Sequence, residues 1–247
     1  MSVARAFGRA ADYDAHAAIQ REAAGRLADR VAALPLPPAP RVLEIGCGTG
    51  LLGAALVDRL ANARWLMTDL APAMVERART RFAGRPEINF AVMDGEAPGV
   101  AGRFDLIVSS LAMQWFADLP ASVERLRGLL APGGWIAFAT LAAGSFAEWR
   151  AAHGDLPAGT PDYPDRQALA AIGLDVSIET LIDRHADARE FLHSVKAIGA
   201  GTPRRGYRPL TPAQLHAVMA RFESTGSVAS YVVATCVGQA TEEETRA

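Results

Sequence analysis

The sequence predicts an α/β protein built on a doubly wound, mostly parallel β-sheet. From residue 41 onward, short apolar runs typical of buried strands alternate with segments whose apolar residues recur at helical spacing. Such alternation is typical of strand–helix–strand units, in which each helix returns the chain to start the next parallel strand. The first apolar run leads into a turn that contains Gly46, Gly48 and Gly50. A ligand is therefore expected at the carboxyl ends of the strands.

The predicted elements follow one another closely between residues 41 and 140. We expect strands over 41–45, 64–68, 88–92, 104–108 and 135–140, and helices over 50–60, 72–83 and 120–130. Pro132, Gly133 and Gly134 are expected to form a tight turn that leads into the fifth strand.

Less regular segments flank this region. Residues 12–33 predict a helix, and the prolines between residues 34 and 40 end it. After residue 144 we expect helices near 145–152, 165–171 and 187–199, and a strand over 231–237 that returns to the sheet edge. The predicted organisation is a helical lid and connector (1–40), a main domain (41–240) with a substrate-side helical insertion at about 145–210, and a polar tail (241–247).

Composition excludes several classes of function. The chain has 247 residues, a formal net charge of −2 and a pI near 6.2, so a nucleic-acid-binding surface is not expected. Its two distant cysteines, Cys47 and Cys236, are expected to be unpaired thiols of a cytoplasmic protein without a metal site. No apolar run is long enough for a signal peptide or a membrane-spanning helix, so we expect no membrane partner.

The glycine turn is compatible with two kinds of cofactor. Gly48, Gly50 and Gly53 satisfy the dinucleotide fingerprint, and Asp69 follows at a suitable distance. Glu44, at the end of the first strand, instead suits the ammonium group of S-adenosylmethionine. A pyrophosphate has no use for an anion there, because it binds bare amides at a helix N-terminus. The pattern therefore favours S-adenosylmethionine.

Two further acids fit the nucleoside half of that cofactor. Asp69 ends the second strand, where it can accept from both ribose hydroxyls or cap a helix. Asp94 follows the third strand and can accept from the exocyclic amine of adenine or form a turn, and Met74 can lie flat on the base or fill the core. The predicted cofactor set is Glu44, Gly46, Cys47, Gly48, Asp69, Leu70, Met74, Asp94, Gly95, Glu96 and Ser110.

With these motifs in place, the chain resembles the class I S-adenosylmethionine-dependent methyltransferases, and more narrowly the malonyl-[acyl-carrier protein] O-methyltransferases of biotin synthesis. The narrower resemblance is carried by residues 7–17 with Gln20, and by 109–115, 118–120, 140–148 and 195–200. It runs over nearly the whole chain and implies a seven-stranded Rossmann-like sheet.

The resemblance implies an enzyme that esterifies the free carboxylate of a malonyl thioester carried by acyl-carrier protein. A carboxylate with a pKa of about 4 is ionised at pH 7, so it can attack the cofactor methyl group in line without a general base. Catalysis would then consist mostly of positioning the reacting atoms and excluding water.

The resemblance also implies roles for residues outside the cofactor turn. Tyr13, His16 and Gln20 fall on one face of the first predicted helix. Tyr13 and Gln20 can hydrogen-bond the methionyl carboxylate or the substrate oxygen, whereas His16 is expected to pack. Gln114 and Trp115 are assigned to the acceptor pocket, although Trp115 also suits a core position. The basic residues assigned to carrier docking are Lys196, Arg204, Arg205 and Arg208, which also suit a solvated loop.

Three other functions stay open on the sequence alone. The acceptor can be another small carboxylic acid, since the cofactor site does not distinguish acceptors. The chain can also be a cofactor-binding assembly factor related to those of respiratory complex I, which share the N-terminal and Gln114–Trp115 segments. A nicotinamide-dependent oxidoreductase is the remaining alternative.

Overall fold

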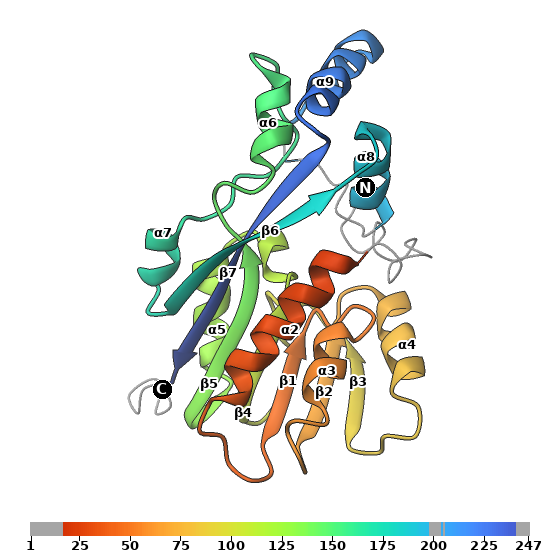
Figure 1. The fold of residues 1–247 in the computed structure, drawn as a ribbon. Helices are drawn as coiled ribbons and strands as arrows, with labels where there is room; N and C mark the ends of the chain where they lie inside the picture. The colour runs from red at the N-terminus through yellow and green to blue at the C-terminus, as the bar shows by residue number, and fades with distance from the viewer. Residues whose placement is uncertain (1–16, 198–203, 205, 241–247) are drawn as a thin grey trace.

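The described part of the chain folds around a single β-sheet. The computed structural model describes residues 17–197, 204 and 206–240 (Figure 1). Seven strands within these residues pair in the order β3-β2-β1-β4-β5-β7-β6. They are β1 (Arg41–Ile45), β2 (Arg64–Asp69), β3 (Ile88–Val92), β4 (Phe104–Ser110), β5 (Leu130–Leu141), β6 (Asp175–Arg184) and β7 (Val228–Gln239). β1 to β5 are parallel and β7 is antiparallel to both of its neighbours, which confirms the predicted doubly wound, mostly parallel sheet.

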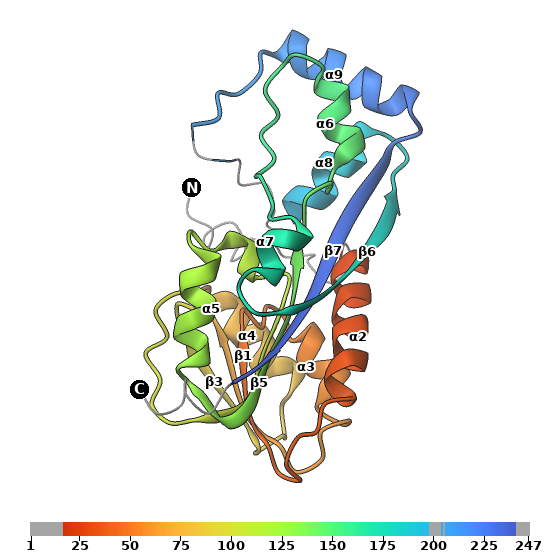
Figure 2. The same cartoon turned by 90° about the vertical axis from the view of Figure 1, so that its left-hand side faces the viewer.

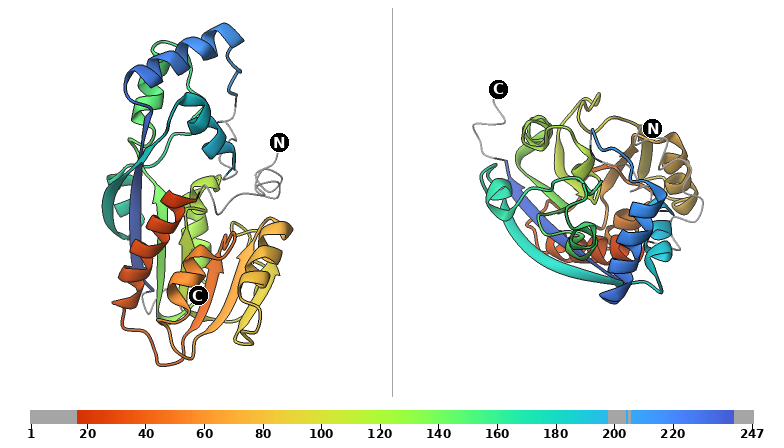
Figure 3. Two further views of the ribbon diagram at one scale, coloured as in Figure 1. Left: turned by 45° about the vertical axis from the view of Figure 1, so that its right-hand side comes forward. Right: turned by 90° about the horizontal axis from the view of Figure 1, so that it is seen from above.

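Helices cover both faces of this sheet. α2 (Ala18–Ala32), α3 (Leu51–Leu56) and α4 (Pro72–Arg81) pack into one core, and α5 (Leu119–Arg127) and α7 (Arg166–Ala170) into another on the opposite face (Figure 2). α6 (Ala147–His153), α8 (Ala188–Ala197) and α9 (Pro212–Ser224) stand beyond the carboxyl ends of the parallel strands (Figures 1 and 3). The 3-10 helix η2 (Met113–Trp115) follows β4. Both cysteines are buried and unpaired.

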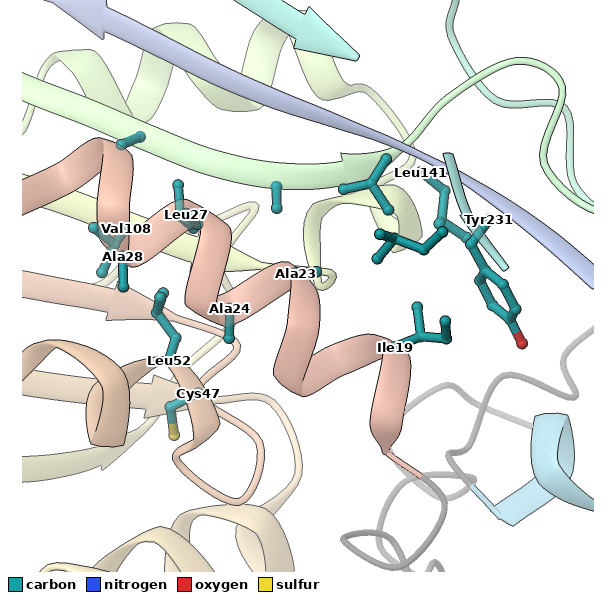
Figure 4. Packing of buried hydrophobic residues seen from close by; sticks show 14 of the residues in the cluster. Ile19, Ala23, Ala24, Leu27, Ala28, Cys47, Leu52, Val108, Leu141 and Tyr231 are labelled. Atoms are coloured by element: carbon teal, nitrogen blue, oxygen red, sulfur yellow. The ribbon is translucent and has the colours of Figure 1, made fainter. Parts of the chain in front are cut away.

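The first described helix packs one face into the core. α2 buries Ile19, Leu27 and Val31 together with three alanines, and Figure 4 shows this face lying against the sheet. The alanines have short side chains, so the helix can approach α3 and the sheet closely. Fully burying Leu27 contributes about 1.5–3 kcal/mol. The prediction of a lid and connector over residues 1–40 stays a prediction, because residues 1–16 lie outside the described residues.

The predicted helical insertion contains a strand that was not predicted. β6 (Asp175–Arg184) forms the sheet edge and pairs with β7, so the predicted edge position of the last strand was wrong. Charged residues and a half-exposed Ile182 occupy this edge, which limits pairing with other chains. α9 was not predicted either, and the predicted end of α3 lies four residues too late.

The predicted turn at residues 132–134 lies within β5 rather than before it, where the pairing with β4 is irregular. Phe104 pairs with Leu130 and Leu106 pairs with Trp135, so four residues of β5 loop out between these pairs. Gly133 has a φ of 74° at this point. Such a φ is costly for other residues, which explains a glycine here.

Candidate active site

The glycine turn lies where the strand order reverses. β1 and β4 are neighbours, and the chain continues outward to β2 on one side and β5 on the other, which opens a crevice at their carboxyl ends. Gly46, Gly48 and Gly50 have φ values of 66°, 55° and 85°. A Cβ atom on Gly46 would lie 2.3 Å from that of Ala112, so only glycine lets the turn meet the loop after β4.

Asp69 ties the end of β2 to this turn. One carboxylate oxygen accepts from the N–H of Gly48 at 2.9 Å, and the other accepts from the N–H of Ala71 at 2.8 Å. Burial raises the pKa of Asp69, and these two hydrogen bonds lower it. α4 has Ala71 at its N-cap, so Asp69 is not the cap of that helix. Each oxygen keeps acceptor capacity for a ligand hydroxyl.

A cavity of about 320 Å³ opens over the turn. This volume lies within the range of about 300–1,000 Å³ typical of small-molecule sites. Eight residues of the predicted cofactor set line it, namely Gly46, Gly48, Asp69, Leu70, Asp94, Gly95, Glu96 and Ser110. Trp115, predicted for the acceptor, lines it as well. The structure therefore brings together acids and glycines from the ends of β1, β2 and β3 with Ser110 from the end of β4.

A smaller cavity of about 30 Å³ adjoins the first and shares Gly46, Gly48 and Ser110 with it. Gln20 reaches it from α2 and Glu44 from β1, and Cys47 also lines it. Gln20 Oε1, Glu44 Oε2 and Ser110 Oγ are all buried and have no hydrogen-bond partner among the described residues. Three side-chain oxygens thus converge on a space that fits one small polar group.

Glu44 has the most perturbed carboxylate of this site. Its side chain is 1% exposed, and this burial raises its pKa to about 8. The N–H of Gly53 lowers that pKa, and the nearby charge of Asp69 raises it further. A cation in the small cavity would favour the ionised form and lower the pKa again.

Some residues of the predicted cofactor set have other contacts. Met74 is 1% exposed and does not line the large cavity, so it fills the core. Asp94 Oδ1 accepts from the N–H of Glu96, which makes Asp94 a turn former as well as a cavity residue. Glu96 Oε1 accepts from the N–H of Ala117 at 2.8 Å and of Asp118 at 3.4 Å. The Glu96 carboxylate therefore holds the chain after η2 in place.

The predicted acceptor residues are divided between two places. Trp115 faces the large cavity, whereas Gln114 lines a second cavity on the α5 side. Lys196 is exposed on α8 and lines neither cavity. Tyr13 and Arg205 lie outside the described residues, as does His16.

Several lining residues were not predicted because their types carry no chemical signal. Met93, Leu111 and Phe116 supply apolar walls of the large cavity. Leu111 has a φ of 49°, which is uncommon for leucine and shows that the loop after β4 is held in a special conformation. A Cβ on Gly95 would lie 2.8 Å from the Phe116 ring, so that glycine makes room for the aromatic wall.

Neither a metal centre nor a membrane span is found within the described residues. These ranges contain no group of three or more acidic, histidine or cysteine side chains that could hold a metal ion. No helix in them has the length and apolar character needed to cross a membrane.

Comparison of the sequence with known proteins identifies the family to which this chain belongs. Residues 43–136 match the family model described as "Methyltransferase domain". A malonyl-[acyl-carrier protein] O-methyltransferase of Magnetococcus marinus is 40% identical over 226 residues, which cover 88% of this chain and 83% of that protein. The chain belongs to the malonyl-[acyl-carrier protein] O-methyltransferase family.

Other relatives agree with this family assignment. A biotin biosynthesis bifunctional protein BioCD of Bordetella avium is 48% identical over 236 residues, or 93% of this chain, and the chain spans 50% of that protein. Among solved structures, the YcgJ protein from Bacillus subtilis superposes with a TM-score of 0.62 at 14% identity, over 88% of this chain and 99% of that one. The structural likeness supports the fold alone. The family confirms the predicted resemblance and decides against the dinucleotide interpretation of the glycine turn.

Proposed function

We propose that this chain transfers a methyl group from S-adenosylmethionine to the free carboxylate of a malonyl thioester carried by acyl-carrier protein. The observation that carries the cofactor half of the proposal is the small cavity, where Gln20, Glu44 and Ser110 present unpartnered oxygens. An ammonium group, with three donors and a positive charge, satisfies such a set. A pyrophosphate is instead bound by bare amides at a helix N-terminus, whereas this cavity presents side-chain oxygens.

The larger cavity has the groups that the nucleoside half requires. Asp69 is assigned to the ribose hydroxyls and Asp94 to the adenine amine, because both line the cavity and keep free acceptor capacity. Leu70 is 46% exposed and lines the same cavity, so it replaces Met74 as the apolar group against the base. The residues present therefore fit the ammonium group, the ribose and the adenine of S-adenosylmethionine.

The residues of this site position and enclose the reacting groups. S-adenosylmethionine, when bound, supplies an electrophilic methyl group on a positively charged sulfur. The acceptor carboxylate is already ionised at pH 7 because its pKa is about 4, so no side chain has to remove a proton. Leu111, Trp115 and Phe116 form walls that limit water around the two charges. Methyl transfer cancels both charges, and a drier site stabilises the separated ions less than water does, which favours the transition state. Positioning of the reacting groups can lower the barrier by about 7–11 kcal/mol.

The acceptor half of the proposal is supported by the relatives and by charge. The similar proteins of Magnetococcus marinus and Geobacter sulfurreducens are both named for malonyl-[acyl-carrier protein]. On α8, Arg189, His193 and Lys196 are exposed at helical spacing, and Arg204 is exposed beyond the helix. Acyl-carrier proteins are acidic, so this basic face would steer their docking.

One assay tests the whole proposal. The purified chain is incubated with methyl-labelled S-adenosylmethionine and malonyl-acyl-carrier protein, and we expect a base-labile methyl ester on the carrier. Label that moves only to free malonate would assign a small dicarboxylate as the acceptor. An absence of transfer to either acceptor, with S-adenosylhomocysteine still bound, would favour the assembly-factor alternative and contradict the proposal.

A further inference from the structure

A second cavity, of about 290 Å³, lies on the opposite face of the sheet from α2. It is enclosed by η2, the start of α5, the end of β5 and residues 162–172. Figure 2 shows α7 beside one end of α5 on this face. Met113, Thr140 and Leu169 form its buried floor, whereas Ala117 and Ala168 at its rim are exposed. The cavity therefore leads from the surface to the ends of the central strands.

Two polar atoms without partners face this space. Thr140 is 0% exposed, and its Oγ1 has no hydrogen-bond partner among the described residues. Gln114 donates from Nε2 to the carbonyl of Leu111 at 2.8 Å, but its buried Oε1 lacks a partner within the same residues. Buried polar groups are almost always hydrogen-bonded, so a ligand that carries both donors and acceptors is indicated.

The described lining of this cavity contains no basic side chain. Its one carboxylate, Asp162, is exposed at the rim and pairs with Arg150 at 3.5 Å. Burial raises the pKa of Tyr163 to about 12, so that phenol is a neutral hydrogen-bonding group at pH 7. Because no basic side chain lines the cavity, it suits a carboxylate or phosphate less well than a neutral amide, which would find matching donors and acceptors.

The second cavity adjoins the cofactor cavity. Phe116 lines both, and the neighbouring residues Gln114 and Trp115 of η2 line one cavity each. A chain-like ligand in the second cavity can therefore present its end beside the methyl-transfer site.

We propose that the second cavity binds the pantetheine arm of the acyl carrier, with Thr140 and Gln114 hydrogen-bonding its amides. This inference rests on the proposed function. The thioester end of the arm then passes Phe116, and the malonyl carboxylate is the anionic group of the acceptor that enters the cofactor cavity. The arm explains why a carrier thioester, rather than free malonate, is the acceptor.

Binding of free pantetheine tests the cavity without relying on catalysis. Saturation-transfer NMR is recorded with pantetheine and the chain loaded with S-adenosylhomocysteine. We expect a transfer signal with the unmodified chain and with Ala170→Trp, which adds the same bulk to an exposed position of α7 outside the cavity. Ala168→Trp, at the rim, should abolish the signal, and Thr140→Val should weaken binding about fivefold by removing one hydrogen bond.

Kinetics separate this inference from the proposed function. Ala168→Trp should raise KM for malonyl-acyl-carrier protein at least tenfold. A malonyl S-methyl thioester lacks the arm, so the rate with this acceptor should not change. The affinity for S-adenosylhomocysteine should not change either. If Ala168→Trp abolishes pantetheine binding but the unmodified chain methylates no malonyl acceptor, the cavity assignment is supported and the function is refuted. Pantetheine that fails to bind, or binds equally to Ala168→Trp, would overturn the cavity assignment.

Discussion

Replacing Glu44 by glutamine should uncouple cofactor binding from proton release. In the free chain, burial raises the pKa of Glu44 to about 8. At pH 7 a group with that pKa is about 90% protonated. The proposed ammonium group binds the ionised form, so uptake of S-adenosylhomocysteine should release about 0.9 proton at pH 7. Glu44→Gln keeps the shape of the side chain but has no proton to lose.

Calorimetry in buffers of different ionisation enthalpy measures this release. The observed binding enthalpy should vary with the buffer for the unmodified chain and should not vary for Glu44→Gln. Adenosine carries no ammonium group and provides a matched control, with no proton release in either protein. Affinity for S-adenosylhomocysteine should also rise as the pH increases from 6 to 8. Equal proton release by the two proteins, or none at pH 7 in the unmodified chain, would refute the assignment of Glu44.

The same carboxylate should make stability of the free chain depend on pH. Its folded-state pKa lies above the ordinary value of 4.5, so the native state holds the proton more tightly than the unfolded state. The resulting stabilisation is complete below pH 4.5 and is lost as the pH rises through 8. A rise from 4.5 to about 8 corresponds to about 5 kcal/mol. Glu44→Gln cannot ionise and should not undergo this loss, so its unfolding free energy should exceed that of the unmodified chain at pH 8.

Three further substitutions test other parts of the site. Gly46→Ala should lower the free energy of unfolding in urea by at least about 2 kcal/mol, because strain and the contact with the loop after β4 combine. Gly48→Ala, with nothing within 4 Å of the added atom, should cost only about 1 kcal/mol and serves as the control. Asp69→Ala should weaken S-adenosylhomocysteine binding by tens-fold in calorimetry, and unchanged affinity would contradict its role. Lys196→Glu should raise KM for malonyl-acyl-carrier protein about threefold at low salt and leave it unchanged at high salt. Arg64→Glu, at the other end of the sheet, is the control and should leave KM unchanged at both salt concentrations.

The central sheet was predictable because its signals are local. Each parallel strand is a short apolar run, and the glycines that follow β1 are required by a backbone with positive φ. The positions of Glu44 and Asp69 followed as soon as the strands were assigned, because parallel strands place their carboxyl ends at one edge. Local pattern and tertiary position agree in this half of the chain.

The second half was harder to predict because its signals are mixed. β6 does show an alternating pattern around Val176 and Ile178, but its charged residues resemble a helix surface or loop. α9 begins with a capping box formed by Thr211 and Gln214, a local signal from which this helix could have been predicted. Met74 was misassigned because a methionine in the first turn of a helix has no local signal that distinguishes core packing from contact with a ligand.

Charge is distributed unevenly between the two cavities, and we expect this distribution to affect both entry of the acceptor and release of the product. The acids Glu44, Asp69 and Asp94 all lie on the cofactor side, where they suit a cationic ligand. The described lining of the second cavity is neutral except for Asp162 at its rim. On the proposed binding mode, a malonyl anion would be drawn past Phe116 by the cofactor's positive charge rather than by a basic residue of the lining. Because methyl transfer removes both charges, that attraction disappears in the product. The ester should therefore dissociate more readily than the substrate does.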